Sequence, residues 1–69
     1  MSPATAGRRR LLRSLLTTQP VSSQQELVDL LDAAGYPVTQ ATVSRDLDAL
    51  GATKERGSNG VARYTIADG

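Results

Sequence analysis

The stretch TQATVSRDLDALG, residues 39–51, carries side chains of the kind that read base pairs in double-stranded DNA. Each base pair presents a distinct pattern of donors, acceptors and methyl groups in the major groove, which is wide enough for an α-helix. Reading that pattern requires short hydrogen-bonding side chains and an arginine near the beginning of the helix. The chemistry indicated is therefore recognition by hydrogen bonding, and the candidate residues are Gln40, Thr42, Ser44 and Arg45.

Each of these side chains has a candidate partner on DNA. Arg45 matches guanine O6 and N7 through its two-pronged guanidinium, and Gln40 matches adenine N6 and N7 or a phosphate. Thr42 can contact a thymine methyl group. Ser44 fits a phosphate contact, aided by the positive end of the helix dipole.

Surface roles without DNA remain open for the same residues. Asp46 and Asp48 follow Arg45 closely, so either could hold it in a surface ion pair. Thr42 and Ser44 could be ordinary solvated positions. Asp48 lies on the outward face, where a carboxylate repels phosphate, so it either accepts from cytosine N4 or points past the backbone.

A short helix must present these side chains, and both of its ends are marked in the sequence. Thr39 can cap the first turn with its hydroxyl, and Gly51 stands where a left-handed residue ends a helix. Val43, Leu47 and Leu50 recur at helical spacing and form one apolar stripe. The stripe faces a core, which leaves the polar side chains to a partner.

Two further helices are predicted before this one. A helix over residues 7–18 has four leucines on one stripe and ends before Pro20. Ser23 and Glu26 form a capping box that begins a second helix. Its connection to the helix after Thr39 is only about four residues long, which is the arrangement of a helix-turn-helix.

The pattern changes to that of strands after Gly51. Residues 52–56 and 61–66 alternate small or apolar with polar side chains, and the sequence GSNG between them predicts a hairpin turn. Because an isolated hairpin is marginal in water, we expect Tyr64 and Ile66 to pack on the helices. The predicted fold class is α/β, a winged helix-turn-helix in which a three-helix bundle is followed by a C-terminal two-stranded β-hairpin wing.

The wing offers a second candidate DNA-binding surface. Lys54 and Arg56 share one strand face, and Asn59 lies in a slim tip that could follow a phosphate backbone or enter a minor groove. The alternative for Asn59 is turn chemistry alone. The basic run Arg8–Arg10 is either a solvated helix beginning or a source of salt-sensitive affinity.

Length and composition limit the function classes. The 69 residues suffice for one small domain, and the absence of Cys and His removes thiol and imidazole catalysis and the usual zinc ligands. We therefore predict no enzyme, no metal and no cofactor in this chain, and a cytoplasmic location without membrane contact.

Residues 1–7 are predicted to be a disordered tail and residues 8–69 to be the domain. The net charge is +1, but the basic residues lie toward the two ends of the sequence and the acidic residues in its middle. Such a distribution can orient a protein on a polyanion.

The sequence SSQQELVDLLDAAGYPVTQATVSRDLDALGATK resembles the N-terminal winged-helix domain of the bacterial arginine repressors, and the likeness extends over about residues 8–66. The motif TQATVSRD, followed by the Leu-Gly pair that ends the helix, is much more specific than a generic helix-turn-helix pattern. In that family the SR pair of the third helix makes critical operator contacts, which carries over to Ser44 and Arg45, with Gln40 and Thr42 in the same motif. The wing residues match by position alone: Lys54, Arg56 and Asn59.

The resemblance implies a transcriptional regulator that represses arginine biosynthesis genes by binding palindromic DNA operators as a homo-hexamer, with L-arginine as corepressor. In that family a C-terminal domain binds arginine and holds the hexamer together. We expect that domain to be absent from these 69 residues. The isolated domain is accordingly expected to be a monomer or weak dimer that binds the operator with reduced affinity and does not bind arginine.

A second function class is a winged helix that serves as a protein-protein interaction module, because a fold does not fix a function. The acidic middle of the chain supports this alternative. A protein-interaction module would be expected to have an apolar exposed face on the third helix, whereas the side chains on that face are Gln, Thr, Ser and Arg.

Overall fold

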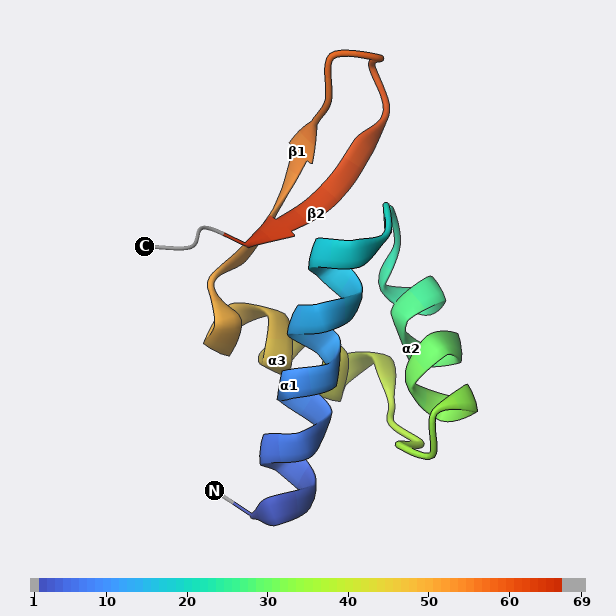
Figure 1. Cartoon of the computed structure of the whole chain (residues 1–69), viewed down its shortest axis with the longest axis vertical. Coiled ribbons are helices and arrows are strands. Elements are labelled where there is room, and N and C mark those ends of the chain that lie inside the picture. The colour runs from blue at the N-terminus through green and yellow to red at the C-terminus, as the bar shows by residue number, and fades with distance from the viewer. Residues whose placement is uncertain (1, 67–69) are drawn as a thin grey trace.

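The computed structural model of the chain describes residues 2–66. These form three helices, α1 (Pro3–Thr18), α2 (Gln24–Ala33) and α3 (Gln40–Leu50), followed by two antiparallel strands, β1 (Ala52–Arg56) and β2 (Ala62–Ile66). Figure 1 shows the helices gathered into a bundle from which the hairpin projects. The predicted winged helix-turn-helix is confirmed.

Helix α1 begins earlier than the sequence analysis predicted. Ser2 is its N-cap and accepts a hydrogen bond from the Thr5 backbone N–H at 3.2 Å. Pro3 occupies the first helical turn, where the missing N–H removes no helical hydrogen bond. The prediction of a disordered tail over residues 1–7 is therefore wrong for residues 3–7, which are helical, while the first residue lies outside the described range. A proline after a serine signals a helix start as readily as a tail.

The predicted caps of the other two helices are confirmed. The Ser23 hydroxyl accepts from the Glu26 backbone N–H at 3.2 Å, and the Thr39 hydroxyl accepts from the Thr42 backbone N–H at 3.3 Å. Gly51 adopts the left-handed conformation, with φ of 72°, and ends α3. These local signals set where α2 begins and where α3 begins and ends.

The core takes apolar side chains from all three helices and from the linker between α1 and α2. Complete burial of one such side chain contributes about 1.5–3 kcal/mol. Tyr64 and Ile66 of β2 pack against this core, as predicted. The buried apolar residues are Leu12, Leu16, Val21, Leu27, Leu31, Val43 and Leu47.

The hairpin is attached to the helices by a backbone hydrogen bond that the sequence analysis did not predict. The Tyr64 N–H donates to the Val21 carbonyl at 2.8 Å, so the linker before α2 runs beside β2. At the other end of the hairpin, the Gly60 N–H donates to the Gly57 carbonyl at 2.9 Å and Gly60 has a φ of 82°. A type I turn followed by a left-handed glycine is a common hairpin connection.

Candidate nucleic-acid interface

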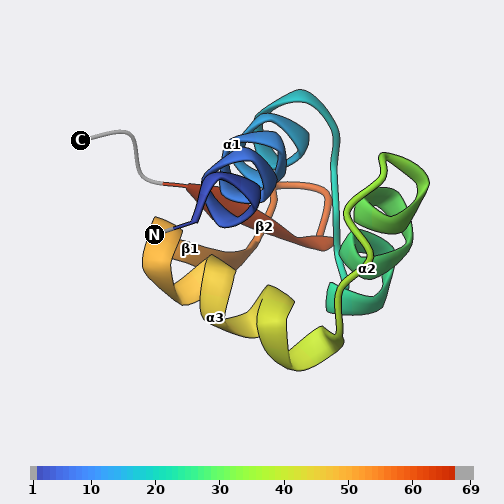
Figure 2. The ribbon, with the colours of Figure 1, turned by 90° about the horizontal axis from the view of Figure 1, so that it is seen from below.

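Helix α3 lies at the edge of the bundle, where one of its faces is uncovered. Figure 2 shows α3 along one side of the molecule, with α1 and the hairpin across from it. Val43 and Leu47 are buried and Leu50 is half-buried, so the predicted apolar stripe is confirmed. Arg45 and Asp48 are exposed on the opposite side.

The Arg45 guanidinium is available to a partner. Within residues 2–66 it makes no hydrogen bond or ion pair, so the predicted alternative of a surface ion pair with Asp46 or Asp48 is not observed. Ser44, the preceding residue, is half-buried at the margin of the exposed face. Arg45 thus lies on the exposed face of α3 and Ser44 at its margin, and a DNA contact by either residue stays a prediction. Whether Asp48 accepts from a base stays a prediction.

Asp46 lies between these exposed residues in sequence but points into the molecule. Its side chain is 1% exposed, and its carboxylate receives three hydrogen bonds from α1. Arg8 donates from Nε to Oδ2 at 2.5 Å and from Nη2 to Oδ1 at 3.0 Å, and Arg9 Nε donates to Oδ1 at 2.8 Å. We call Asp46, Arg8 and Arg9 the carboxylate clamp.

The clamp fixes the charge state of its acid. Burial alone raises the pKa of the Asp46 carboxyl, but the hydrogen bonds from Arg8 and Arg9 outweigh burial and hold that pKa below its ordinary value. The hydrogen bond to Asp46 likewise raises the pKa of Arg8. A charged Asp46 therefore joins the first half of α1 to α3. Of the basic run Arg8–Arg10, two members serve this contact and Arg10 is exposed.

The first turn of α3 is more constrained than the sequence analysis predicted. Thr42 is half-buried, and its hydroxyl lies 3.2 Å from the Thr39 hydroxyl, so it takes part in the cap. Gln40 is exposed, and its Nε2 donates to Oε1 of Gln24 at 3.3 Å. Gln24 was not among the predicted site residues, because pairing across two helices leaves no signal in local sequence.

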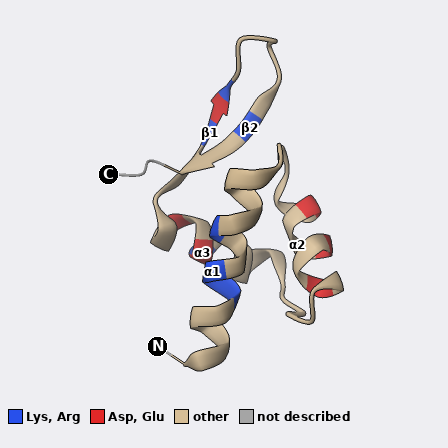
Figure 3. Cartoon of the chain, viewed as in Figure 1, with Lys and Arg blue, Asp and Glu red and all other residues tan. Residues whose placement is uncertain are grey.

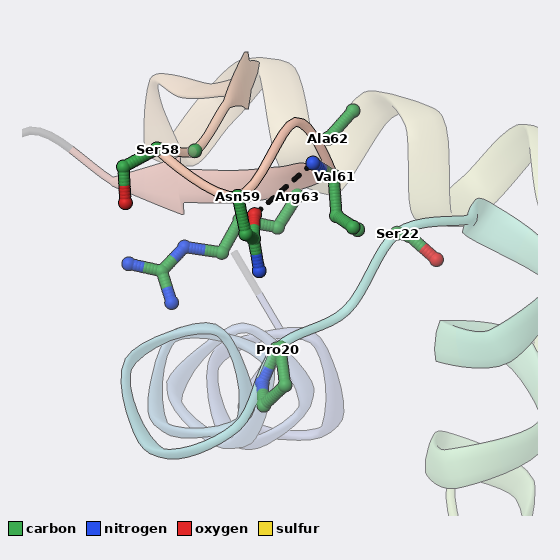
Figure 4. Close-up of a pocket in the computed structure, with 8 residues that line it drawn as sticks. Pro20, Ser22, Ser58, Asn59, Val61, Ala62 and Arg63 are labelled. Atoms are coloured by element: carbon green, nitrogen blue, oxygen red, sulfur yellow. Dashed lines mark hydrogen bonds between the residues drawn. The ribbon is translucent and has the colours of Figure 1, made fainter.

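Two cations of the wing, Lys54 and Arg56, share one face of β1, and the third, Arg63, lies on β2. Lys54 and Arg56 are exposed, and Lys54 Nζ lies 5.7 Å from the centre of the Tyr64 ring on the neighbouring strand. A cation over an aromatic face is weakly attracted to it, so Tyr64 steadies the lysine. Asn59 Oδ1 accepts from the Val61 N–H at 3.0 Å, the dashed line in Figure 4. The turn role predicted as the alternative for Asn59 is therefore present, and a DNA contact by its amide nitrogen stays a prediction.

The charges divide by element. Figure 3 shows acidic residues along α2, whereas basic residues lie on α1 and the hairpin. The acidic middle of the sequence thus lies chiefly on α2. The exposed side of α3 combines one arginine with one aspartate.

A shallow cleft of about 520 Å³ lies between the wing and the linker after α1, as Figure 4 shows. Arg63 is its one charged lining residue, and Val61 beside it is 58% exposed. Within residues 2–66 no three His, Cys, Asp or Glu side chains gather to hold a metal ion. No helix in the same range has the length and apolar character needed to cross a bilayer.

Comparison with known proteins gives a family for this fold and surface. The family described as "Arginine repressor, DNA binding domain" matches residues 4–69. The arginine repressors of Bacillus pumilus and Bacillus velezensis are each 43% identical over 63 residues, which is 90% of this chain and 42% of each relative. The arginine repressor of Bacillus subtilis is 44% identical over 55 residues, 80% of this chain and 37% of the relative. The chain thus spans less than half the length of these relatives.

Proposed function

The chain belongs to the arginine repressor family through its DNA-binding domain, and from this premise we propose that it is the sequence-reading part of an arginine-responsive transcriptional repressor. One observation carries the proposal beyond the family match. In the run Ser44-Arg45-Asp46, the aspartate is buried in the carboxylate clamp, while the arginine is exposed and unpaired within residues 2–66. The clamp thereby removes one of the two acids that follow Arg45 from the surface that would meet DNA, and Asp48 stays on it.

The contacts divide into those that read bases and those that hold the backbone. Arg45, on the exposed side of α3, is the candidate for guanine in the major groove. Ser44, at the margin of that face, is the candidate for a phosphate. Lys54 and Arg56 of the wing would bind the flanking backbone, where cations contribute affinity that salt weakens. The domain would act by binding and not by catalysis.

The larger assembly is also part of the proposal. We propose that the operators are palindromic DNA sites that control arginine biosynthesis genes in the cytoplasm. L-arginine binding and hexamer formation would belong to sequence beyond the 69 residues. Several reading heads joined in one assembly bind a repeated operator far more tightly than one head does. The isolated domain would then be a weakly binding monomer.

The decisive experiment compares binding to a palindromic arginine operator and to a scrambled duplex over a range of salt concentrations. Arg45→Ala should lose about 1–3 kcal/mol of specific binding and keep the weak, salt-dependent binding that both duplexes share. Arg10→Ala is the matched control, because it removes the same charge from an exposed position on α1. An Arg45→Ala variant that still prefers the operator would refute base reading by α3. Equal, weak binding of the unaltered chain to both duplexes would favour the protein-interaction alternative.

A further inference from the structure

Gln24 and Gln40 start two different helices and meet between them. Each is the first residue of its helix and follows a capping residue, Ser23 for α2 and Thr39 for α3. The Gln40 Nε2 donates to Gln24 Oε1 at 3.3 Å. Gln24 is half-buried and Gln40 is exposed, so the pair lies at the surface of the helix-turn-helix.

We propose that Gln24 is a positioning residue for base reading: it holds the Gln40 side-chain amide in one orientation and thereby gives the domain a preference for adenine at one operator position. The inference rests on the proposed function, since it needs α3 to enter the major groove. It adds a specificity-determining residue on α2, outside the reading helix.

The chemistry of a primary amide supports this role. The group has two N–H donors on one arm and a carbonyl acceptor on the other. Binding adenine uses the oxygen to accept from N6 and one N–H to donate to N7. The second N–H of Gln40 is then left over, and it is the group that Gln24 Oε1 can accept. All of the amide's donors can thus be used at the same time.

The same hydrogen bond restricts rotation of the Gln40 amide. A half-turn of Gln40 alone would bring its oxygen against Gln24 Oε1 and place two acceptors face to face, so Gln40 can turn only if Gln24 turns with it. The Gln40 amide is therefore less free to turn before DNA arrives. A side chain that is already held loses less freedom on binding, which strengthens recognition without any added contact to the base.

The test uses a pool of DNA duplexes with a randomised central segment, from which bound duplexes are separated and sequenced. For the unaltered chain we expect adenine to be enriched at one position and guanine at another, the latter from Arg45. Gln24→Ala should reduce the adenine enrichment on the order of fivefold, the lower end of what a bidentate base contact contributes, and leave the guanine enrichment in place. Gln25→Ala is the matched control, because Gln25 is an exposed neighbour on α2 whose amide donates to Asp29 instead.

Gln24→Glu separates positioning from a general structural role. A carboxylate can only accept, so this variant should keep the adenine preference while its negative charge lowers affinity for every duplex alike. Combining Gln24→Ala with Gln40→Ala should lose no more adenine preference than Gln40→Ala alone.

The outcomes distinguish this inference from the proposed function. Undiminished adenine enrichment in Gln24→Ala, or equal loss in Gln24→Glu and Gln24→Ala, would overturn the positioning role while leaving base reading by Arg45 intact. An unaltered chain that enriches no base at any position would overturn the proposed function itself and the inference with it.

Discussion

Replacing Asp46 by Asn should destabilise the domain even though the change lies in the middle of the reading helix. The carboxylate accepts three hydrogen bonds from Arg8 and Arg9 and is buried. An asparagine keeps the shape but loses the charge, and its NH₂ group would face guanidinium donors. Two cations would then lie together without the anion that neutralises them.

The size of the effect follows from the burial of the clamp. Removing one partner of a buried ion pair costs about 3–5 kcal/mol. The side chains of Arg8 and Arg9 are 15% and 30% exposed and can turn partly to water. We therefore expect a loss near the lower end, about 3 kcal/mol. A domain of this length has a free energy of unfolding of roughly 3–10 kcal/mol, so the variant would keep roughly 0–7 kcal/mol of it.

Urea unfolding followed by circular dichroism at neutral pH measures this loss. In a small domain the free energy of unfolding falls by about 1 kcal/mol per molar urea. The expected loss of about 3 kcal/mol therefore lowers the urea midpoint by about 3 M. Asp48→Asn is the matched control, since it makes the same chemical change at an exposed position two residues along α3. Equal midpoints for the two variants would refute the role assigned to the clamp.

The pH dependence of stability is a second test of the contact between Asp46 and the two arginines. The folded-state pKa of Asp46 lies below its ordinary value of 3.8, so the carboxylate contributes stability that is fully present above that pH. This contribution is lost as the pH falls through the folded-state pKa. The unaltered chain and Asp46→Asn should therefore converge in stability below pH 3.8 and differ most near neutrality. A constant difference across that range would contradict the assignment.

Three further predictions test the core, the cap and the wing. Leu27→Ala should cost about 2–5 kcal/mol of unfolding free energy, because this side chain is fully buried; a loss below about 1 kcal/mol in urea unfolding would contradict the core described above. Gly51→Ala should cost about 1–2 kcal/mol, because a β-carbon there meets open space but strains a φ of 72°; an unchanged thermal midpoint would refute this. Lys54→Ala should lower the slope of log affinity against log salt by about 1 with operator preference unchanged, and an unaltered slope would remove Lys54 from the interface.

The parts of the fold that could be predicted are those that local chemistry determines. Ser23 and Thr39 cap helices because their hydroxyls reach an amide three residues ahead, and Gly51 tolerates a left-handed conformation. The hairpin follows in the same way from alternation and a glycine-containing turn. The exposure of Arg45 also followed, because the apolar stripe of α3 determines which side of the helix is free.

The parts that were missed depend on contacts between distant segments. The sequence offers Asp46 only as a possible surface partner of Arg45, since sequence alone does not show that α1 brings two arginines to it. Gln24 was overlooked for the same reason, as its partner Gln40 lies on another helix. The early start of α1 is different: Ser2 and Pro3 are a local signal that the small, polar composition of the first residues obscured.

The hydrogen bond between Tyr64 and Val21 joins two segments that are far apart in the chain. It joins the last strand to the linker after the first helix, so the loop that it closes contains both α2 and α3. Closing a long loop is entropically costly until the segment inside it is ordered. We therefore expect the helices to form the folding nucleus and the wing to dock after the transition state, with φ-values near zero in β2. The reading helix would thus be in place before the wing is.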